Sequence, residues 1–300
     1  MFKRPILPVV LTLGVAACGV ALGEDVSFPP KGPPVTQSAV IPTAIPAKLS
    51  FPQTARGPVP AVVIAHASGG LMEGGPELDY VAVLNAEGIA TLVIDMWTPR
   101  GVPIGPAAFG GEGGVDRRPH VIGDTLPDAF GALRFLAAQP AIDRKRIGIM
   151  GFSWGAMLSV LAMSEGGAER ALGGDLRFAA HSAHDFVCSY FLPGAPMAAA
   201  IAARWTEAPL QLQVGGQDDY DNADDGAACR RLVEGLPTDK RRQVALIVYP
   251  DATHMWEQKL PFPITIHDPR KGNVRIATEA EASARARQST VAFFKTAFGL

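Results

Sequence analysis

Continuous apolar runs alternate with stretches of helical spacing along most of this chain. The apolar runs predict buried strands at residues 60–65, 90–96, 146–150, 177–183, 210–214 and 244–249. Apolar residues at helical spacing predict helices at residues 76–87, 124–139, 154–164, 224–236 and 277–298. Such alternation is typical of an α/β fold, in which crossover helices flank both faces of a mostly parallel, doubly wound sheet.

The N-terminal residues have a different pattern, which is typical of a targeting segment. Lys3 and Arg4 precede an apolar run at residues 5–23, and small residues before Glu24 fit cleavage of a secretory signal peptide. A second interpretation is a lipobox ending at Cys18, whose lipidation would attach the protein to a membrane. A third is an uncleaved anchor. We expect export to the periplasm or beyond, with membrane attachment only if Cys18 is lipidated.

The remaining chain divides into two predicted parts. Residues 24–57 are Pro-rich and lack helical periodicity, and residues 47–51 fit an edge strand, where flanking prolines are tolerated. Residues 58–300 carry the alternating pattern and form the predicted α/β domain. In this second part, no run is long and apolar enough to span a bilayer.

Composition narrows the classes of partner. Hydrophobic residues make up 48% of the chain, charged residues 19%, and the formal net charge is -2, so the chain can bury a core but offers no basic footprint for nucleic acid. If Cys18 is removed or lipidated, Cys188 and Cys229 remain as an even pair in an oxidising compartment. This predicts a disulfide, with two unpaired buried thiols as the alternative.

A G-x-S-x-G motif stands at residues 151–155, between a predicted strand and a predicted helix. A turn this tight needs small residues on both sides of the central Ser153, and it lifts the serine hydroxyl out of the carboxyl edge of the sheet. The alternative is an ordinary turn with an N-capping serine. The strand–turn–helix context favours Ser153 as a nucleophile.

A nucleophilic serine needs a general base and an acid that orients the base. In the α/β-hydrolase arrangement, the acid and then the histidine follow the serine along the chain. His254 lies just after the last predicted strand, and Asp218 follows the preceding strand. We therefore predict Asp218 and His254 as partners of Ser153, with Asp219 as an alternative acid.

The oxyanion hole needs two backbone N–H donors. One should be the N–H of Trp154, directly after the nucleophile. The other should come from the Gly-rich loop at residues 66–70, where we choose Ser68, with Ala67 as the alternative. His66 is more simply explained as a structural residue that packs this loop.

From about residue 61 to about residue 256, the chain resembles the dienelactone hydrolase family of the α/β-hydrolases. The resemblance rests on the order of five segments, at residues 62–70, 93–101, 146–155, 215–219 and 249–254. It implies an α/β-hydrolase domain, a triad of Ser153, Asp218 and His254, and oxyanion donors at Ser68 and Trp154. It implies no cofactor and a small-molecule ester as substrate.

Two positions depart from the family's pattern. The family's namesake enzymes use a cysteine nucleophile, where this chain has Ser153, which favours hydrolysis of general carboxylic esters or lactones over dienelactone itself. The loop that usually begins His-Gly begins His66-Ala67 here.

Substrate contacts are expected in the Gly/Pro-rich loop at residues 97–120, since long loops of this kind are often functional. Arg100 and Arg117 are candidates to bind a substrate carboxylate, as is Arg118, and Trp97 is a candidate to line an apolar pocket. The alternative for the arginines is pairing with local acids, and for Trp97 it is core packing.

Two other functional classes remain as alternatives. His181, His184 and Asp185 supply metal-ligand types for a metal-dependent hydrolase, although residues three apart on a strand face opposite ways. A non-catalytic binding protein could keep the same scaffold. The sequence does not identify the substrate or the oligomeric state.

Overall fold

The computed structural model describes residues 23–36, 40–53, 57–109, 118–119, 121–165 and 176–300. The predicted signal peptide, except Gly23, lies outside these residues, as do Cys18 and Arg117. Among the described residues, no helix has both the length and the apolar character needed to cross a membrane.

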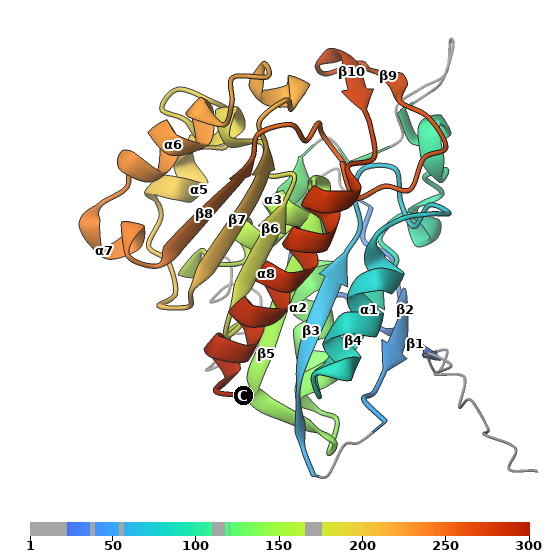
Figure 1. Ribbon diagram of the computed structural model, residues 1–300. Helices are drawn as coiled ribbons and strands as arrows, with labels where there is room; N and C mark the ends of the chain where they lie inside the picture. The colour runs from blue at the N-terminus through green and yellow to red at the C-terminus, as the bar shows by residue number, and fades with distance from the viewer. Residues whose placement is uncertain (1–22, 37–39, 54–56, 110–117, 120, 166–175) are drawn as a thin grey trace, which may run out of the picture.

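In the described part of the chain, eight strands form one twisted sheet in the order β1-β2-β4-β3-β5-β6-β7-β8 (Figure 1). Strands β3 to β8 run parallel to one another, whereas β2 is antiparallel to both β1 and β4. The bounds are β1 Glu24–Phe28, β2 Ile45–Ser50, β3 Val59–Ala65, β4 Ala90–Ile94, β5 Ile142–Phe152, β6 His181–His184, β7 Leu210–Gly215 and β8 Val244–Tyr249.

Helices cover both faces of the sheet, which explains why β3 and β4 are apolar and buried along their whole length. Helices α1 (Glu77–Ala86) and α8 (Ala280–Phe298) lie side by side on the face nearest the viewer in Figure 1. Helices α2 (Leu126–Ala137) and α3 (Trp154–Leu161) lie behind it. Three short helices flank the β8 end, at α5 (Ala198–Ala202), α6 (Ala227–Glu234) and α7 (Thr238–Arg241).

The predicted α/β fold is confirmed, with three differences in its strands. The strand expected at residues 47–51 is β2, which is not at the edge, because β1 pairs with its outer side. Strand β5 begins at Ile142, earlier than expected, and β6 begins only at His181. The loop at residues 97–120 contains two short 3-10 turns in its described part, η1 (Thr98–Arg100) and η2 (Gly105–Phe109).

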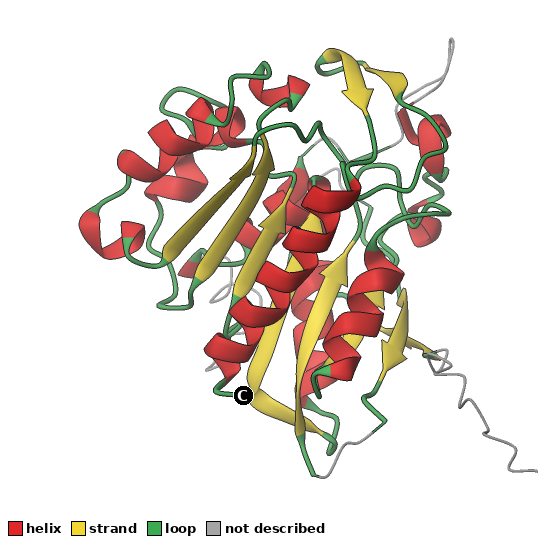
Figure 2. Ribbon diagram, in the orientation of Figure 1, coloured by secondary structure: helices red, strands yellow, loops and turns green. Residues whose placement is uncertain are grey.

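An antiparallel hairpin of β9 (Ile264–Asp268) and β10 (Gly272–Ile276) was not predicted from the sequence. It forms a separate two-stranded sheet at the end of the molecule toward which the parallel strands point (Figure 2). Its strands are five residues each, too short for their alternating pattern to stand out.

Candidate active site

The G-x-S-x-G motif forms the turn from β5 into α3, and its central residue is strained. Ser153 has φ 49° and ψ -103°, a combination that non-glycine residues rarely adopt. A Cβ atom on Gly151 would lie 2.3 Å from the carbonyl carbon of Gly155, and one on Gly155 would lie 2.2 Å from the carbonyl oxygen of Ala65. Both flanking positions therefore require glycine, as the sequence indicated.

The structure brings Ser153, His254 and Asp218 into one hydrogen-bonded line. The Nε2 atom of His254 lies 2.8 Å from the Ser153 hydroxyl oxygen, and its Nδ1 lies 2.7 Å from a carboxylate oxygen of Asp218. All three side chains are buried, with 6% exposure for Ser153 and 2% for each of the others. With Nδ1–H donating to Asp218, Nε2 is left to accept the serine proton, which is the geometry of a nucleophile and its general base.

Neighbouring carboxyl groups raise the pKa of His254. Burial acts to lower the pKa of His254, but the charge and hydrogen bond of Asp218, together with the charge of Asp185, outweigh it and hold this pKa above its usual value. Asp185 is itself buried, which raises its pKa to about 8, and it accepts the N–H of Met255 at 2.8 Å. The residue after the imidazole is thereby fixed in a left-handed conformation, at φ 53°.

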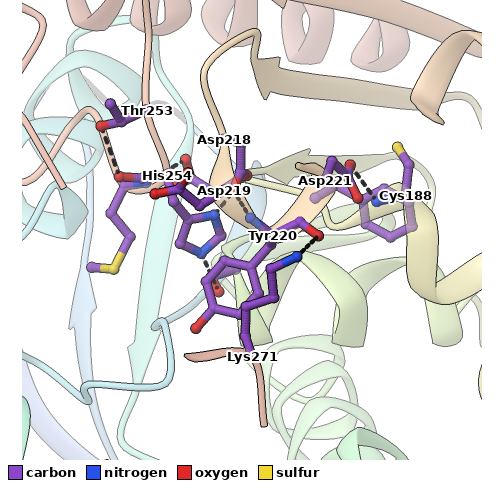
Figure 3. A network of polar contacts seen from close by, with 12 residues as sticks. Cys188, Asp218, Asp219, Tyr220, Asp221, Thr253, His254 and Lys271 are labelled. Atoms are coloured by element: carbon purple, nitrogen blue, oxygen red, sulfur yellow. Dashed lines mark hydrogen bonds and ion pairs between the residues drawn. The ribbon is translucent and has the colours of Figure 1, made fainter. Parts of the chain in front are cut away.

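The acid is held by the turn η5 (Asp219–Asp221), as Figure 3 shows. The second carboxylate oxygen of Asp218 accepts the backbone N–H of Tyr220 at 2.8 Å, and the Tyr220 ring packs against the imidazole of His254, with 4.4 Å between ring centres. The Tyr220 hydroxyl donates to Asp268 of β9 at 2.6 Å. This one tyrosine therefore contacts the acid, the base and the hairpin.

A disulfide joins Cys188 to Cys229 beside this turn. The carboxylate of Asp221, three residues after the acid, accepts the backbone N–H groups of Cys188 at 2.9 Å and of Ser189 at 2.8 Å. These contacts fix the turn that carries Asp218 to the segment that carries the disulfide. The two cysteines and Asp221 have the ligand types of a metal site, but their sulfurs are bonded to each other.

Two carbonyl groups of the loop after β3, those of Ala67 and Ser68, accept hydrogen bonds from buried side chains. His66 donates through Nδ1 to the carbonyl of Ala67 at 2.7 Å and accepts the N–H of Met96 through Nε2 at 3.0 Å, and burial lowers its pKa to about 4. The indole N–H of Trp97 donates to the carbonyl of Ser68 at 2.8 Å. Within the described part of the chain, the N–H groups of Ala67 and Ser68 have no acceptor, so either can serve as the second oxyanion donor.

His66 and Trp97 thus fix the loop at residues 66–70 from its buried side. His66 is neutral and structural, as the sequence suggested. Trp97 is fully buried against His66 and Trp154, so its expected role as a substrate contact is wrong, and it supports the loop instead. The Trp154 ring is also buried, with its indole N–H directed at the hydroxyl of Thr125 at 3.2 Å.

The structure pairs Arg100 and Arg118 with carboxylates of the protein itself, so it contradicts their predicted contacts with substrate. Arg100 forms two hydrogen bonds to Asp128, at 2.7 and 3.0 Å, and both side chains are almost completely buried. Its expected role as a substrate ligand is therefore wrong, because leaving Asp128 unpaired in the core would be costly. Arg118 is buried beside Asp268, at 3.4 Å.

The metal-site alternative is contradicted by where its residues point. His181 bonds to the carbonyl of Ser159 in α3, whereas His184 faces the opposite side of the sheet, where Thr290 of α8 and Glu257 are its partners. Asp185 is committed to the backbone of Met255. The three side chains do not converge on one point.

Three functional contacts were missed by the sequence analysis. Tyr220, Asp185 and Asp268 act through neighbours that are distant in the chain, so no local motif marks them. The one available signal is the Asp-rich stretch around residues 218–225, a composition typical of turns, which does not identify the partners of the turn.

Comparison with known proteins agrees with this geometry. A family model described as "Dienelactone hydrolase family" matches residues 45–298. No curated protein gives a significant match. Among solved structures, a dienelactone hydrolase from Anabaena variabilis is similar, with 20% identity, a TM-score of 0.56, and coverage of 90% of this chain and 98% of the other.

Two further solved structures share the fold. Thermogutta terrifontis esterase 2, phosphoramylated by tabun, has 14% identity and a TM-score of 0.60, with coverage of 94% of this chain and 96% of the esterase. A dienelactone hydrolase-like promiscuous phosphotriesterase from metagenomic libraries has 17% identity and a TM-score of 0.55, with coverage of 92% and 100%.

Proposed function

Because this chain belongs to the dienelactone hydrolase family, we propose that it is a serine hydrolase that cleaves carboxylic esters or lactones through an acyl-enzyme on Ser153. The observation that carries the proposal is the continuous line of hydrogen bonds from Asp218 through His254 to Ser153. Each link is short, buried and correctly ordered for proton transfer.

In the first half of the reaction, Nε2 of His254 takes the proton of Ser153 while the serine oxygen attacks the substrate carbonyl. The negative charge that develops on the carbonyl oxygen is stabilised by the N–H of Trp154, at the N-terminus of α3, and by an N–H of the loop at Ala67 and Ser68. The imidazolium then protonates the departing alkoxide. The C–O bond of the ester breaks, and the acyl group remains on the serine.

In the second half, a water molecule takes the place of the alcohol. His254 accepts one proton of that water as its oxygen attacks the acyl carbon, and the proton passes to the oxygen of Ser153 when the acyl bond breaks. The products are an acid and a free enzyme in its starting state. Asp218 keeps the imidazole in the tautomer and orientation that both halves require.

The test is a Ser153→Ala variant assayed on p-nitrophenyl butyrate. We expect kcat to fall by at least about a thousandfold, because triad members act as a unit, and labelling by a fluorophosphonate probe to disappear. Ser159→Ala, in the same helix, is the matched control and should keep both. Near-normal turnover by Ser153→Ala would show that the nucleophile is misassigned.

We also propose that the protein works outside the cytoplasm, periplasmic or secreted, with a lipid anchor at Cys18 as the alternative. The order of charged and apolar residues before Glu24 supports export. A disulfide between Cys188 and Cys229 is consistent with an oxidising compartment.

A further inference from the structure

An apolar groove lies beside the candidate active site. It encloses about 650 Å³, including solvent at its open side. Its apolar walls come from three parts of the chain: the β9–β10 hairpin, the segment after the catalytic histidine, and the loop after β3. They are formed by Ile264, Ile266, Ile276, Leu260, Met255 and Met72.

Two residues of the groove wall directly follow site residues in the chain. Met255, in its wall, directly follows His254, and His254 itself forms a β-bridge with Ile276 of β10. Gly69, also in the wall, directly follows Ser68 of the oxyanion loop. The groove therefore begins one residue away from His254 and from Ser68, close enough to receive a substituent of a substrate bound at Ser153.

The hairpin that forms one wall is fixed in position. Along β9, Ile264 and Ile266 are half-buried and face inward, whereas Thr265 between them and His267 after them are exposed. The turn of the hairpin is tied to the catalytic loops, since Lys271 donates to the carbonyl of Tyr220 at 3.2 Å and the guanidinium of Arg270 lies over the Trp154 ring, 5.6 Å from its centre. The wall is thus built before substrate arrives.

The charges around the groove disfavour an anionic substrate. Among the described residues that line it, none is Lys or Arg, and Glu73 is the one charged side chain. A small neighbouring cavity, which shares Met72, Met255 and Gln258 with the groove, is lined by the carboxyl groups of Glu77, Asp185 and Glu257. A carboxylate placed in the groove would lie near Glu73 without a cation among the lining residues to pair with it.

We propose that this groove holds the hydrocarbon chain of an uncharged ester, so that the enzyme prefers medium-length aliphatic esters to the shortest esters and to anionic lactones. The proposal rests on the proposed ester hydrolysis at Ser153. The chain can belong to either the acyl or the alcohol side of the ester. The chemistry of recognition is the same, namely removal of methylene groups from water.

The experiment measures kcat/KM for p-nitrophenyl acetate, butyrate, hexanoate and octanoate, and in parallel for ethyl, butyl and hexyl acetates. We expect kcat/KM to rise by up to about fourfold per methylene in at least one series, since this is the ratio that burial of one methylene supplies. A monoester of a dicarboxylic acid, of the same length, should be a poorer substrate than its neutral counterpart.

Paired substitutions on β9 test whether the groove causes the chain-length preference. Ile266→Trp should fill the groove and reduce kcat/KM for hexanoate at least tenfold while acetate changes less than threefold, and Ile266→Ala should shift the optimum toward longer chains. Thr265→Trp and Thr265→Ala, on the outer face of the same strand, are matched controls and should leave the chain-length profile unchanged.

Three results would overturn the groove assignment: equal rates across both series, preference for the anionic monoester, or a uniform effect of Ile266→Trp and Ile266→Ala on all chain lengths. Each differs from failure of the proposed function. In that case neither acetates nor longer esters would be hydrolysed, and Ser153 would not react with a fluorophosphonate.

Discussion

At the scale of single residues, the site contains strained backbone positions, of which Ser153 and Met255 adjoin the imidazole of His254. Ser153 and Met255 both have positive φ values, which cost energy in residues with a side chain. The strain at Ser153 presents the nucleophile, and the strain at Met255 directs the chain after His254 into the wall of the groove. The backbone N–H of Ser153 donates to the carbonyl of His184 at 2.8 Å, and that of Met255 to Asp185, so neighbouring segments hold both positions.

Asp185→Asn provides a test of how His254 is tuned. Asparagine can still accept the N–H of Met255, but it removes a carboxyl group that helps to raise the pKa of His254. Because the reaction needs a neutral imidazole, the fall of kcat/KM on the acid side should move to lower pH in this variant. The control is Asp251→Asn, which replaces an exposed carboxyl group in the loop that carries His254. An unchanged pH profile would mean that Asp185 does not act on His254.

The same variant should alter the pH dependence of stability. Burial raises the pKa of Asp185 to about 8, so the folded state keeps a proton that the unfolded state loses above its ordinary pKa of 3.8. The free energy of unfolding of the native protein, relative to Asp185→Asn, should therefore fall between about pH 4 and pH 8. The expected slope is about 1.4 kcal/mol per pH unit. Urea unfolding across this range gives the slope, and parallel curves for the two proteins would contradict it.

At the scale of elements, three neighbouring segments fix the position of the turn η5. The disulfide segment holds Asp221, the hairpin holds Tyr220, and β7 delivers Asp218 at its carboxyl end. A loop with this many long-range contacts can keep a carboxylate within hydrogen-bonding distance of His254 without substrate. The triad is therefore preorganised.

Replacement of both Cys188 and Cys229 by serine tests this arrangement. The bond closes a separation of 41 residues that includes the acid, and chain-entropy estimates give a loss of about 4 kcal/mol on its removal. We expect a lower urea midpoint, and a lower kcat because the Asp221 contacts loosen. The native protein, kept oxidised, is the reference. Unchanged stability and unchanged kcat would show that the turn does not depend on the disulfide.

The elements also show what the sequence could and could not predict. The central strands and the long helices were recognisable because each carries a continuous apolar run or helical spacing, and the triad candidates followed from their places after those strands. The hairpin β9–β10 and the edge strand β1 were missed, because a five-residue alternating pattern is brief and its partner strand decides whether it forms. The roles of Arg100 and Trp97 were misjudged because burial cannot be read from a loop's composition.

At the scale of the whole molecule, the candidate catalytic residues lie at one edge of the sheet, where the parallel strands end. The parallel strands β3, β5, β7 and β8 all end at the edge of the sheet below the hairpin (Figure 1), and the segments that follow them carry the loop at residues 66–70, Ser153, Asp218 and His254. Segments far apart in the sequence meet there because parallel strands all end on that side.

The proposed export can be tested with the chain of residues 1–300. Expressed in a bacterium with a periplasm, the protein should appear outside the cytoplasm with its N-terminus near Glu24 and without free thiols at Cys188 and Cys229. N-terminal sequencing, fractionation and thiol titration of the unfolded, non-reduced protein measure these points. A lipid-modified Cys18 would support the anchor alternative, and an intact cytoplasmic chain would contradict export.

Tyr220 links the hairpin to the triad, and this has a consequence for how new specificities can arise. A substitution that moves β9 to admit another substrate also moves Asp268, and with it the ring that rests on His254. A change in the groove wall at β9 can therefore also change the position of His254. We therefore expect substitutions that move β9 to disturb the Tyr220–His254 contact as well as the groove, whereas substitutions of Leu260 or Met72 should change the groove alone.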